Sequence, residues 1–383
     1  MISYSKNQFT TLFVVASLST IFNACITMQK NIPSFQWKIY DSLPSIDGKS
    51  SIGYAGPVIG IHNDMMVVAG GANFPDEMPW MGGKKQYHQE AFVIDINQTQ
   101  DGFKQFSLPT DIAYSANCSS PLGIVYAGGE NEKGVSDQAF LIRWMDGKLN
   151  FAPLPNLPKP LTNAAATCIG DEIYVAGGED SKTVSSSFYK LNLNDTTQGW
   201  MSLADIAHPV SNAVLVATNN GENIYLIGGR MKNIGDTSTL YKNVYQYNIE
   251  KDQWVEKQSL PYALSAGTGS IINDDFIALY GGDKGVVYHK TEELIHAINR
   301  EQDSVKKQLL NQEKIKLQTE HPGFSNTVLV YDMLNDTWST AGDIHFTTPV
   351  TTTAIKIGDR IFIPSGEIKA GVRTPHILEG TIK

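Results

Sequence analysis

Basic residues and cysteines are both scarce in this sequence. Among 383 residues, 30 Lys and Arg stand against 39 Asp and Glu, the formal net charge is -9, and there are 3 cysteines. A nucleic-acid-binding surface needs a basic excess that releases counterions from phosphates, so we exclude nucleic acid as a partner. We expect Cys118 and Cys168, which lie in apolar strand patterns, to be free buried thiols. A disulfide between them stays open as the alternative.

The sequence also lacks the motifs of several enzyme classes. Its eight histidines are scattered, and none lies within four residues of another, so no zinc-type spacing occurs. There is no Gly-x-Ser-x-Gly nucleophile elbow and no glycine loop of the phosphate-binding kind. We therefore expect neither a metal nor a cofactor.

Long hydrophobic runs are missing except at the N-terminus. Residues 9–22 follow Lys6 and are apolar, which matches a signal-peptide core and is shorter than the about 20 residues that a spanning helix needs. Ala24 then precedes Cys25, and a small residue before cysteine is what lipoprotein signal peptidases accept. We predict a signal peptide over 1–25, a lipid on Cys25, and an exported protein that is anchored in the bacterial cell envelope. A soluble periplasmic protein is the alternative.

Glycine pairs recur with a regular period. Each pair closes an apolar strand, and the separations are 58, 49, 51 and 53 residues. The pairs are Gly70-Gly71, Gly128-Gly129, Gly177-Gly178, Gly228-Gly229 and Gly281-Gly282. A period of about 50 residues is that of a kelch-type propeller blade. A sixth, degenerate copy is Ser365-Gly366.

Each repeat predicts four short strands, and the ends of the chain predict how the ring closes. The last repeat lacks its final strand, whereas residues 35–40 read as a final strand without a blade. Pairing the two satisfies both open edges. We predict a single all-β domain over 33–383, a six-bladed kelch-type β-propeller whose N-terminal strand completes the last blade. Late aromatics such as Trp200, Trp254 and Trp338 are expected to pack between blades.

Blade five is about 30 residues longer than the period of about 50 requires. Residues 291–320 contain no Gly or Pro and place apolar residues at helical offsets, namely Leu294, Ile298, Val305 and Leu309. We predict a helical insertion over about 288–322, which ends at His321-Pro322-Gly323. Its charged residues predict a solvated face, and a lid over the channel mouth is the alternative.

The residue after each doublet is a candidate for the site. In a propeller these positions return to one end of the central channel, where they can handle a polar ligand. They are Ala72, Glu130, Glu179, Arg230, Asp283 and Glu367. The alternative is that Glu130, Glu179 and Asp283 only cap turns.

The stretch from residue 366 to 374 is the most informative of the sequence. It reads Gly-Glu-Ile-Lys-Ala-Gly-Val-Arg-Thr and contains Glu367 and Arg373. This pattern resembles the signature of the kelch-type N-acetylneuraminate epimerases, the sialic acid mutarotases. Residues 55–74, with Gly60-Ile61, Asn63-Asp64 and Ala69 to Phe74, resemble a second part of that family. Here the second part comes first, so the chain resembles a cyclically permuted branch, which a closed ring tolerates.

The resemblance implies an isomerase that interconverts the α and β anomers of sialic acid without a cofactor. It implies that Glu367 is the general base and that Arg373 binds the carboxylate of the substrate, an acidic sugar. Arg230 and Asn73 are candidates for further substrate contacts. Two other functions stay open: a kelch module that binds a glycan or a protein without turnover, and a mutarotase for another sugar.

Overall fold

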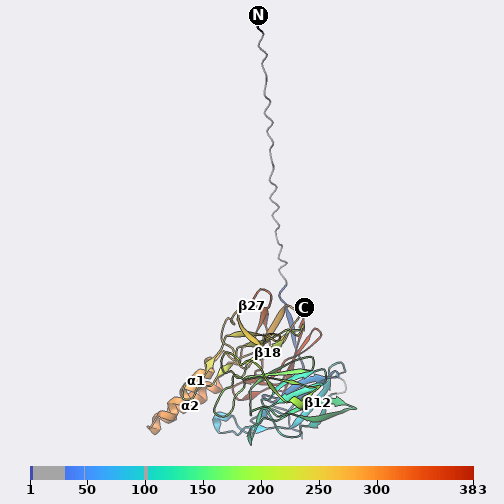
Figure 1. The fold of residues 1–383 in the computed structure, drawn as a ribbon. Helices are drawn as coiled ribbons and strands as arrows, with labels where there is room; N and C mark the ends of the chain where they lie inside the picture. Colours follow the sequence, from blue (N-terminus) through green and yellow to red (C-terminus); the bar gives the residue numbers. More distant parts are fainter. Residues whose placement is uncertain (3–30, 47, 99–101) are drawn as a thin grey trace. The chain divides into compact units, whose positions relative to one another are not determined.

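Six antiparallel sheets of four strands follow one another along the chain (Figure 1). The computed structural model describes residues 1–2, 31–46, 48–98 and 102–383. The predicted signal peptide and Cys25 therefore lie outside the described residues, apart from residues 1–2. The innermost strands of neighbouring sheets contact each other, and the sixth contacts the first. The described part of the chain is thus a six-bladed β-propeller, as predicted.

The strands of each blade run from the channel outward in sequence order. Blade one has β2 (Val58–His62), β3 (Met65–Ala69), β6 (Glu90–Asp95) and β7 (Lys104–Ser107). Blade two has β8 (Ala116–Ser120), β9 (Gly123–Ala127), β12 (Ala139–Met145) and β13 (Lys148–Leu154). Blade three has β14 (Ala165–Ile169), β15 (Glu172–Ala176), β16 (Phe188–Asn192) and β17 (Met201–Ser202). Blade four has β18 (Val214–Ala217), β19 (Asn223–Ile227), β22 (Val244–Asn248) and β23 (Gln253–Lys257). Blade five has β24 (Thr268–Ile271), β25 (Phe276–Tyr280), β26 (Thr327–Asp332) and β27 (Thr337–Asp343).

Blade six contains both ends of the folded chain. Its strands are β28 (Ile355–Ile357), β29 (Arg360–Pro364), β32 (His376–Ile382) and β1 (Phe35–Ser42). β1 pairs antiparallel with β32, which confirms the predicted closure. An ion cluster ties the two ends together: Glu379 on β32 lies 3.1 Å from Lys38 on β1 and 2.7 Å from Arg360 on β29.

The late aromatic residues join neighbouring blades. The indole N–H groups of Trp200, Trp254 and Trp338 donate to backbone carbonyls just after the last strand of the preceding blade, at 2.8–2.9 Å. The rings pack into the apolar layers between blades. The predicted packing role of these residues is confirmed.

Glycine is required at the doublets because the next blade packs directly against the backbone there. Both glycines of each doublet have a positive φ, which only glycine adopts without cost. A Cβ atom on Gly177 would lie 2.2 Å from the carbonyl oxygen of Val210. In the degenerate copy, Ser365 is fully buried. Its hydroxyl accepts from Tyr54 N–H at 2.9 Å and donates to the carbonyl of Thr374 at 2.8 Å.

The insertion in blade five is a pair of helices, α1 (Val286–Arg300) and α2 (Ser304–Thr319), drawn in orange in Figure 1. Helices are thus present where the apolar spacing predicts them. Of the apolar residues at helical offsets, Leu294 is buried, while Val305 and Leu309 are 65% and 60% exposed. The helical segment is interrupted between α1 and α2. The carboxylate of Asp303 caps α2 by accepting from two backbone N–H groups. None of the described helices is long and apolar enough to span a membrane.

Candidate functional site

A closed ring of backbone hydrogen bonds surrounds the neck of the channel. Its members precede the first strand of each blade and all have φ between 51° and 62°. Each N–H donates to the carbonyl of the preceding member at 2.7–3.0 Å, and the first donates to the last. The six members are Gly56, Tyr114, Asn163, Asn212, Ala266 and Thr351. This ring fixes where the loops of all six blades begin.

Two cavities border this ring. The channel cavity has a volume of about 480 Å³ and is lined by the innermost strands. The mouth cavity has a volume of about 230 Å³ and is lined by residues that follow the glycine doublets. Five members of the ring, all except Gly56, line both.

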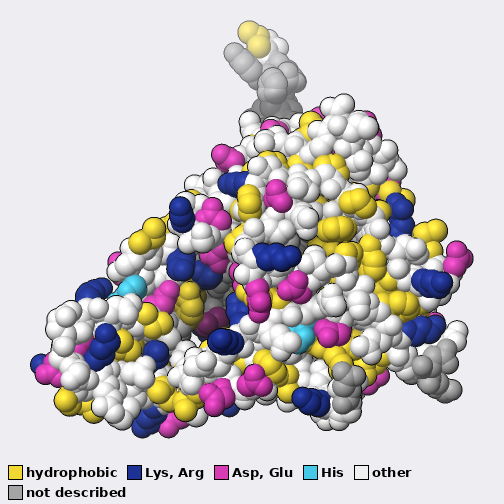
Figure 2. Space-filling model, turned by 90° about the horizontal axis from the view of Figure 1, so that it is seen from below, with side chains coloured by type: hydrophobic (Ala, Val, Ile, Leu, Met, Phe, Trp, Pro, Cys, Tyr) yellow, Lys and Arg dark blue, Asp and Glu magenta, His cyan; other side chains and the backbone are white. Residues whose placement is uncertain are grey.

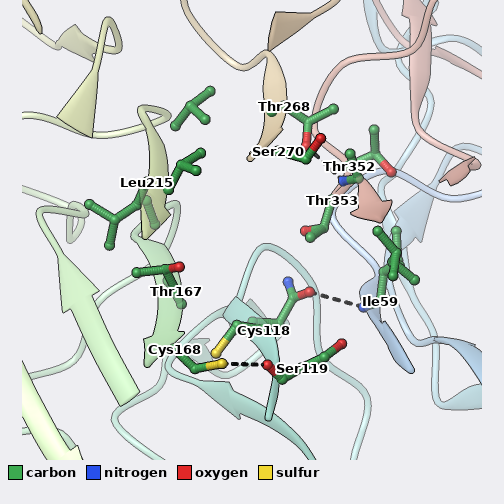
Figure 3. A pocket seen from close by; sticks show the side chains of 18 of the residues that line it. Ile59, Cys118, Ser119, Thr167, Cys168, Leu215, Thr268, Ser270, Thr352 and Thr353 are labelled. Carbon is green, nitrogen blue, oxygen red and sulfur yellow. Dashed lines mark hydrogen bonds between the residues drawn. The ribbon is translucent and has the colours of Figure 1, made fainter. Parts of the chain in front are cut away.

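The polar groups of the channel cavity serve the fold. Side chains on several innermost strands accept hydrogen bonds from backbone N–H groups of a neighbouring blade (Figure 3). Asn117 accepts from Ile59 N–H at 3.0 Å, for example. Cys118 and Cys168 are free thiols on adjacent blades, as expected, and the Cys168 thiol donates to a backbone carbonyl. Among the described lining residues, Lys356 alone is charged.

The mouth cavity gathers several of the predicted residues. Arg230, Asp283 and Glu367 line it. Asp283 accepts from the N–H of Gly285 at 2.8 Å, which is the turn-capping contact expected as the alternative. Glu179 and Glu130 instead form ion pairs, with Arg230 at 2.7 Å and with Lys85 at 2.9 Å. The structure thus brings together carboxylates and cations from several blades, whereas Ala72 is buried.

Glu367 and Arg373 lie on one small hairpin, formed by β30 (Glu367–Lys369) and β31 (Val372–Arg373). The N–H of Gly371 donates to Oε1 of Glu367 at 2.8 Å, and Nη1 of Arg373 lies 3.5 Å from Oε2. The Arg373 guanidinium is stacked on Phe74 with 4.9 Å to the ring centroid. Its Nη1 is buried and has no hydrogen-bond partner among the described residues. The Glu367 carboxylate is thereby held by the backbone N–H of Gly371 and the guanidinium of Arg373. Nη1 of Arg373 lies beside it without a hydrogen bond of its own to a described residue.

Arg230 lies on another blade of the mouth, in the hairpin of β20 (Arg230–Met231) and β21 (Thr239–Leu240). Besides its bond to Glu179, its guanidinium lies 5.8 Å from the ring centroid of Tyr288, which belongs to α1. Nη1 of Arg230 is buried and has no partner within the described part of the chain. Since Tyr288 lines the mouth cavity, the insertion contributes a wall to it.

Asn73 lies between Ala72, whose carbonyl accepts from Nε of Arg373 at 3.3 Å, and Phe74, on which Arg373 stacks. It is on β4 (Ala72–Asn73), which pairs with β5 (Gln86–Tyr87), and it is 4% exposed. Its amide donates to the carbonyl of Gly53 at 3.0 Å, and its Oδ1 lies 2.8 Å from Nε2 of His88. Both polar atoms are therefore bound within the protein, and a substrate contact by Asn73 stays a prediction.

The loop between β4 and β5 packs against the hairpin of Glu367 and Arg373. It contains the 3-10 helix η1 (Pro79–Met81), which contacts α2. A Cβ atom on Gly371 would lie 2.8 Å from the Pro79 ring and 2.9 Å from the Trp80 ring. The segment of blade one and the insertion of blade five therefore both border the Glu367 hairpin.

Sequence reasoning missed Tyr114, Lys85 and Tyr288. Nζ of Lys85 lies 5.0 Å from the ring centroid of Tyr114. Burial lowers the pKa of Lys85, but the neighbouring Tyr114 and Glu130 outweigh it and the pKa is raised. Superposing the six repeats would have shown one tyrosine at a position otherwise taken by small or amide residues. Lys85 and Tyr288 have no such signal, because each lies in an insertion that occurs in one blade.

The described residues contain no group of three or more His, Cys, Asp or Glu side chains that could hold a metal ion. The described residues at the mouth provide carboxylates, cations and hydroxyl groups.

A family model described as N-acetylneuraminate epimerase matches residues 154–383. The chain belongs to this family. The matched segment includes Arg230, Glu367 and Arg373, and it also includes both helices of the insertion. The permuted order of the blades is tested by none of these matches and stays a prediction.

Proteins named N-acetylneuraminate epimerase are similar to part of the chain. The one from Shigella sonnei (strain Ss046) is 24% identical over 157 residues, which are 41% of this chain and 42% of the relative. The one from Yersinia pestis (strain Pestoides F) is 30% identical over 135 residues, 32% and 33% of the two chains. The one from Escherichia coli (strain K12) is 23% identical over 157 residues, 41% and 42%. The chain thus spans less than half the length of the curated relatives it matches.

Proposed function

We propose that this protein is a mutarotase that interconverts the α and β anomers of N-acetylneuraminate. The observation that carries the proposal is the Glu367 carboxylate, which lines the mouth cavity while Gly371 and Arg373 hold it. Membership of the epimerase family supports the same conclusion.

Glu367 acts as the base in this proposal. Opening the sugar ring requires removal of the proton from the anomeric hydroxyl group and protonation of the ring oxygen. A carboxylate that is positioned by a backbone N–H can take the first proton without rearrangement. The ring then opens to the keto form and recloses on the other face, which needs no redox partner.

Arg373 binds the carboxylate of the sugar. In this substrate the carboxylate is attached to the anomeric carbon, so its cation must lie beside the base that takes the anomeric proton. Arg373 is a buried cation on the hairpin of Glu367. Its Nη1 lies 3.5 Å from the Glu367 carboxylate but forms no hydrogen bond with any described residue. A guanidinium matches a carboxylate with two parallel hydrogen bonds. Arg230, on a different blade, then contacts the remainder of the sugar.

The anionic substrate approaches a protein of net charge -9. On the face seen in Figure 2, acidic and basic side chains are interspersed, and neither sign forms a broad patch. Local cations therefore decide the binding of the anion, since charges further apart than about 8 Å are largely screened at physiological salt.

The test is proton NMR of freshly released α-anomer, with and without protein. We expect the wild type to accelerate the approach to the anomer equilibrium and Glu367→Gln to lose about 10²–10⁴-fold of that rate. Glutamine retains an acceptor for Gly371, so the melting temperature should hold. Binding of sialic acid without any acceleration would favour a binding module. Acceleration of another sugar alone would identify a different substrate.

A further inference from the structure

The proposed reaction needs a proton donor as well as a base. Glu367 takes a proton from one oxygen of the anomeric carbon, and the ring oxygen on the same carbon must receive one. Its donor must therefore lie close to Glu367, border the same cavity and carry a proton at neutral pH. Several groups that line the mouth carry a proton at neutral pH. Among the described ones, the tyrosine phenols are more acidic than the guanidinium of Arg230 and the hydroxyl groups of Ser265 and Thr351.

Tyr114 borders the mouth cavity together with Glu367. It is a member of the closed ring and has φ of 58°, a conformation that is costly for an aromatic residue. A Cβ atom on Gly56, the preceding member, would lie 2.3 Å from Cδ1 of Tyr114. The aromatic ring of Tyr114 thus occupies space that a larger residue at position 56 would take.

Charged groups from three blades act on this phenol. Arg373 and Glu367 come from blade six, Lys85 from blade one and Glu130 from blade two. Burial raises the pKa of Tyr114, and the two carboxylates add to this, while Lys85 and Arg373 act against it. The phenol therefore keeps its proton at neutral pH. Two cations are nevertheless in place to stabilise the phenolate that forms when the proton leaves.

The other tyrosines at the mouth already have partners. The hydroxyl of Tyr87 donates to Glu130 at 2.7 Å, and that of Tyr288 lies 3.3 Å from the hydroxyl of Ser238. No side chain or backbone group in the described ranges forms a hydrogen bond with the hydroxyl of Tyr114. It is the hydroxyl that is free to meet a ligand.

We propose that the hydroxyl group of Tyr114 is the general acid that protonates the ring oxygen of the sugar, opposite Glu367. The inference rests on the proposed function. The anomeric hydroxyl gives its proton to Glu367 and becomes the keto carbonyl, while the bond from the anomeric carbon to the ring oxygen breaks. The ring oxygen takes the proton of Tyr114 and becomes a hydroxyl group. On reclosure that hydroxyl returns its proton to Tyr114, and Glu367 returns its proton to the carbonyl oxygen, so no proton is gained or lost.

The experiment measures kcat and KM for anomer exchange by NMR in wild type and in Tyr114→Phe. Phenylalanine keeps the ring that packs on Gly56 and removes the hydroxyl alone. We expect kcat to fall about 10²-fold or more while KM for sialic acid stays within about threefold of the wild type. Tyr126→Phe is the matched control, because the Tyr126 hydroxyl is buried in the core without a partner among the described residues. It should retain full activity.

A second variant separates a proton donor from a structural hydroxyl. Placing 3-fluorotyrosine at position 114 makes the phenol more acidic at nearly constant size. The high-pH limb of the kcat profile should then move to lower pH, whereas a hydroxyl with a structural role alone would leave the profile unchanged. Unchanged kcat in Tyr114→Phe with an active wild type overturns the inference and leaves the proposed function standing. A folded wild type that does not accelerate the exchange overturns both. A Tyr114→Phe variant that loses affinity with kcat intact reduces Tyr114 to a binding residue and also overturns the inference.

Discussion

Nη1 of Arg373 lies 3.5 Å from Oε2 of Glu367, and the two residues are paired across one short hairpin at the mouth of the propeller. The glycine between them in the turn donates to the other carboxylate oxygen. Because the carboxylate and the cation share one hairpin, their separation is set within that hairpin, while Phe74 of blade one packs on the guanidinium.

The first prediction concerns the carboxylate of the substrate. Arg373→Lys keeps the charge but loses the planar pair of donors, and we expect KM for sialic acid to rise about 10-fold or more. The methyl ester of sialic acid is the matched probe, because it lacks the negative charge. Wild type should prefer the acid over the ester, and Arg373→Lys should lose most of this preference. If Arg230→Lys abolishes the preference and Arg373→Lys retains it, the assignment of the two arginines is reversed.

The second prediction concerns the doublets. Gly177→Ala should destabilise the protein by more than about 2 kcal/mol, because a positive φ costs about 1–2 kcal/mol and the new methyl group meets the Val210 carbonyl. Gly170→Ala is the control, since Gly170 has φ of 56° and no atom within 4 Å of the added Cβ. Urea unfolding of both variants gives the difference. Equal losses of stability would show that the doublet is retained for its backbone conformation alone.

The third prediction concerns acid stability at the closure. Burial raises the pKa of Glu379, but the hydrogen bonds and charges of Arg360 and Lys38 outweigh it, and the pKa lies below its usual value. Its contribution is therefore present above about pH 4.3, the value of an unfolded glutamate, and is lost as the pH falls through the folded pKa. Glu379→Gln should be less stable at pH 7 and should lose less stability than wild type between about pH 5 and pH 3. Parallel curves for the two proteins would contradict this.

The fourth prediction concerns export, which we propose from the sequence of residues 1–25. In a bacterial host the protein should be labelled by a fatty-acid analogue and appear in the membrane fraction. Cys25→Ser should lose the label. A mature wild-type chain without lipid, recovered from the periplasm, would identify the soluble alternative, and retention in the cytoplasm would contradict both.

Local sequence signals were enough to predict the fold, and they placed Glu367 and Arg373 in one loop. The glycine doublets indicate a backbone conformation that few other residues adopt, and they mark the blades. Residues 35–40 indicate a strand without a partner in its own repeat, and this predicted the closure of blade six. Glu367 and Arg373 are six positions apart in one loop. Because they are so close in sequence, their proximity in space could be predicted.

The other features of the site depended on contacts between segments that are distant in the sequence. Tyr288 lines the mouth cavity and Lys85 contacts the ring of Tyr114, each from an insertion in a different blade. No local pattern connects them with Glu367. Asn73 matched the family pattern, but its side chain is bound by Gly53 and His88. The helical insertion was found from its composition, whereas its division at Asp303 is a capping effect that the apolar spacing did not show.

The closure of blade six has a consequence for the synthesis of the chain. Strand β1 leaves the ribosome before every other strand of the propeller, but its partner β32 ends one residue before the C-terminus at Lys383. Until β32 is available, β1 has an unpaired edge and the sheet of blade six is incomplete. Pairing across such a separation is slow, and open strand edges promote aggregation in the meantime. A chain truncated before His376 would retain five complete blades and still expose a strand edge at each end.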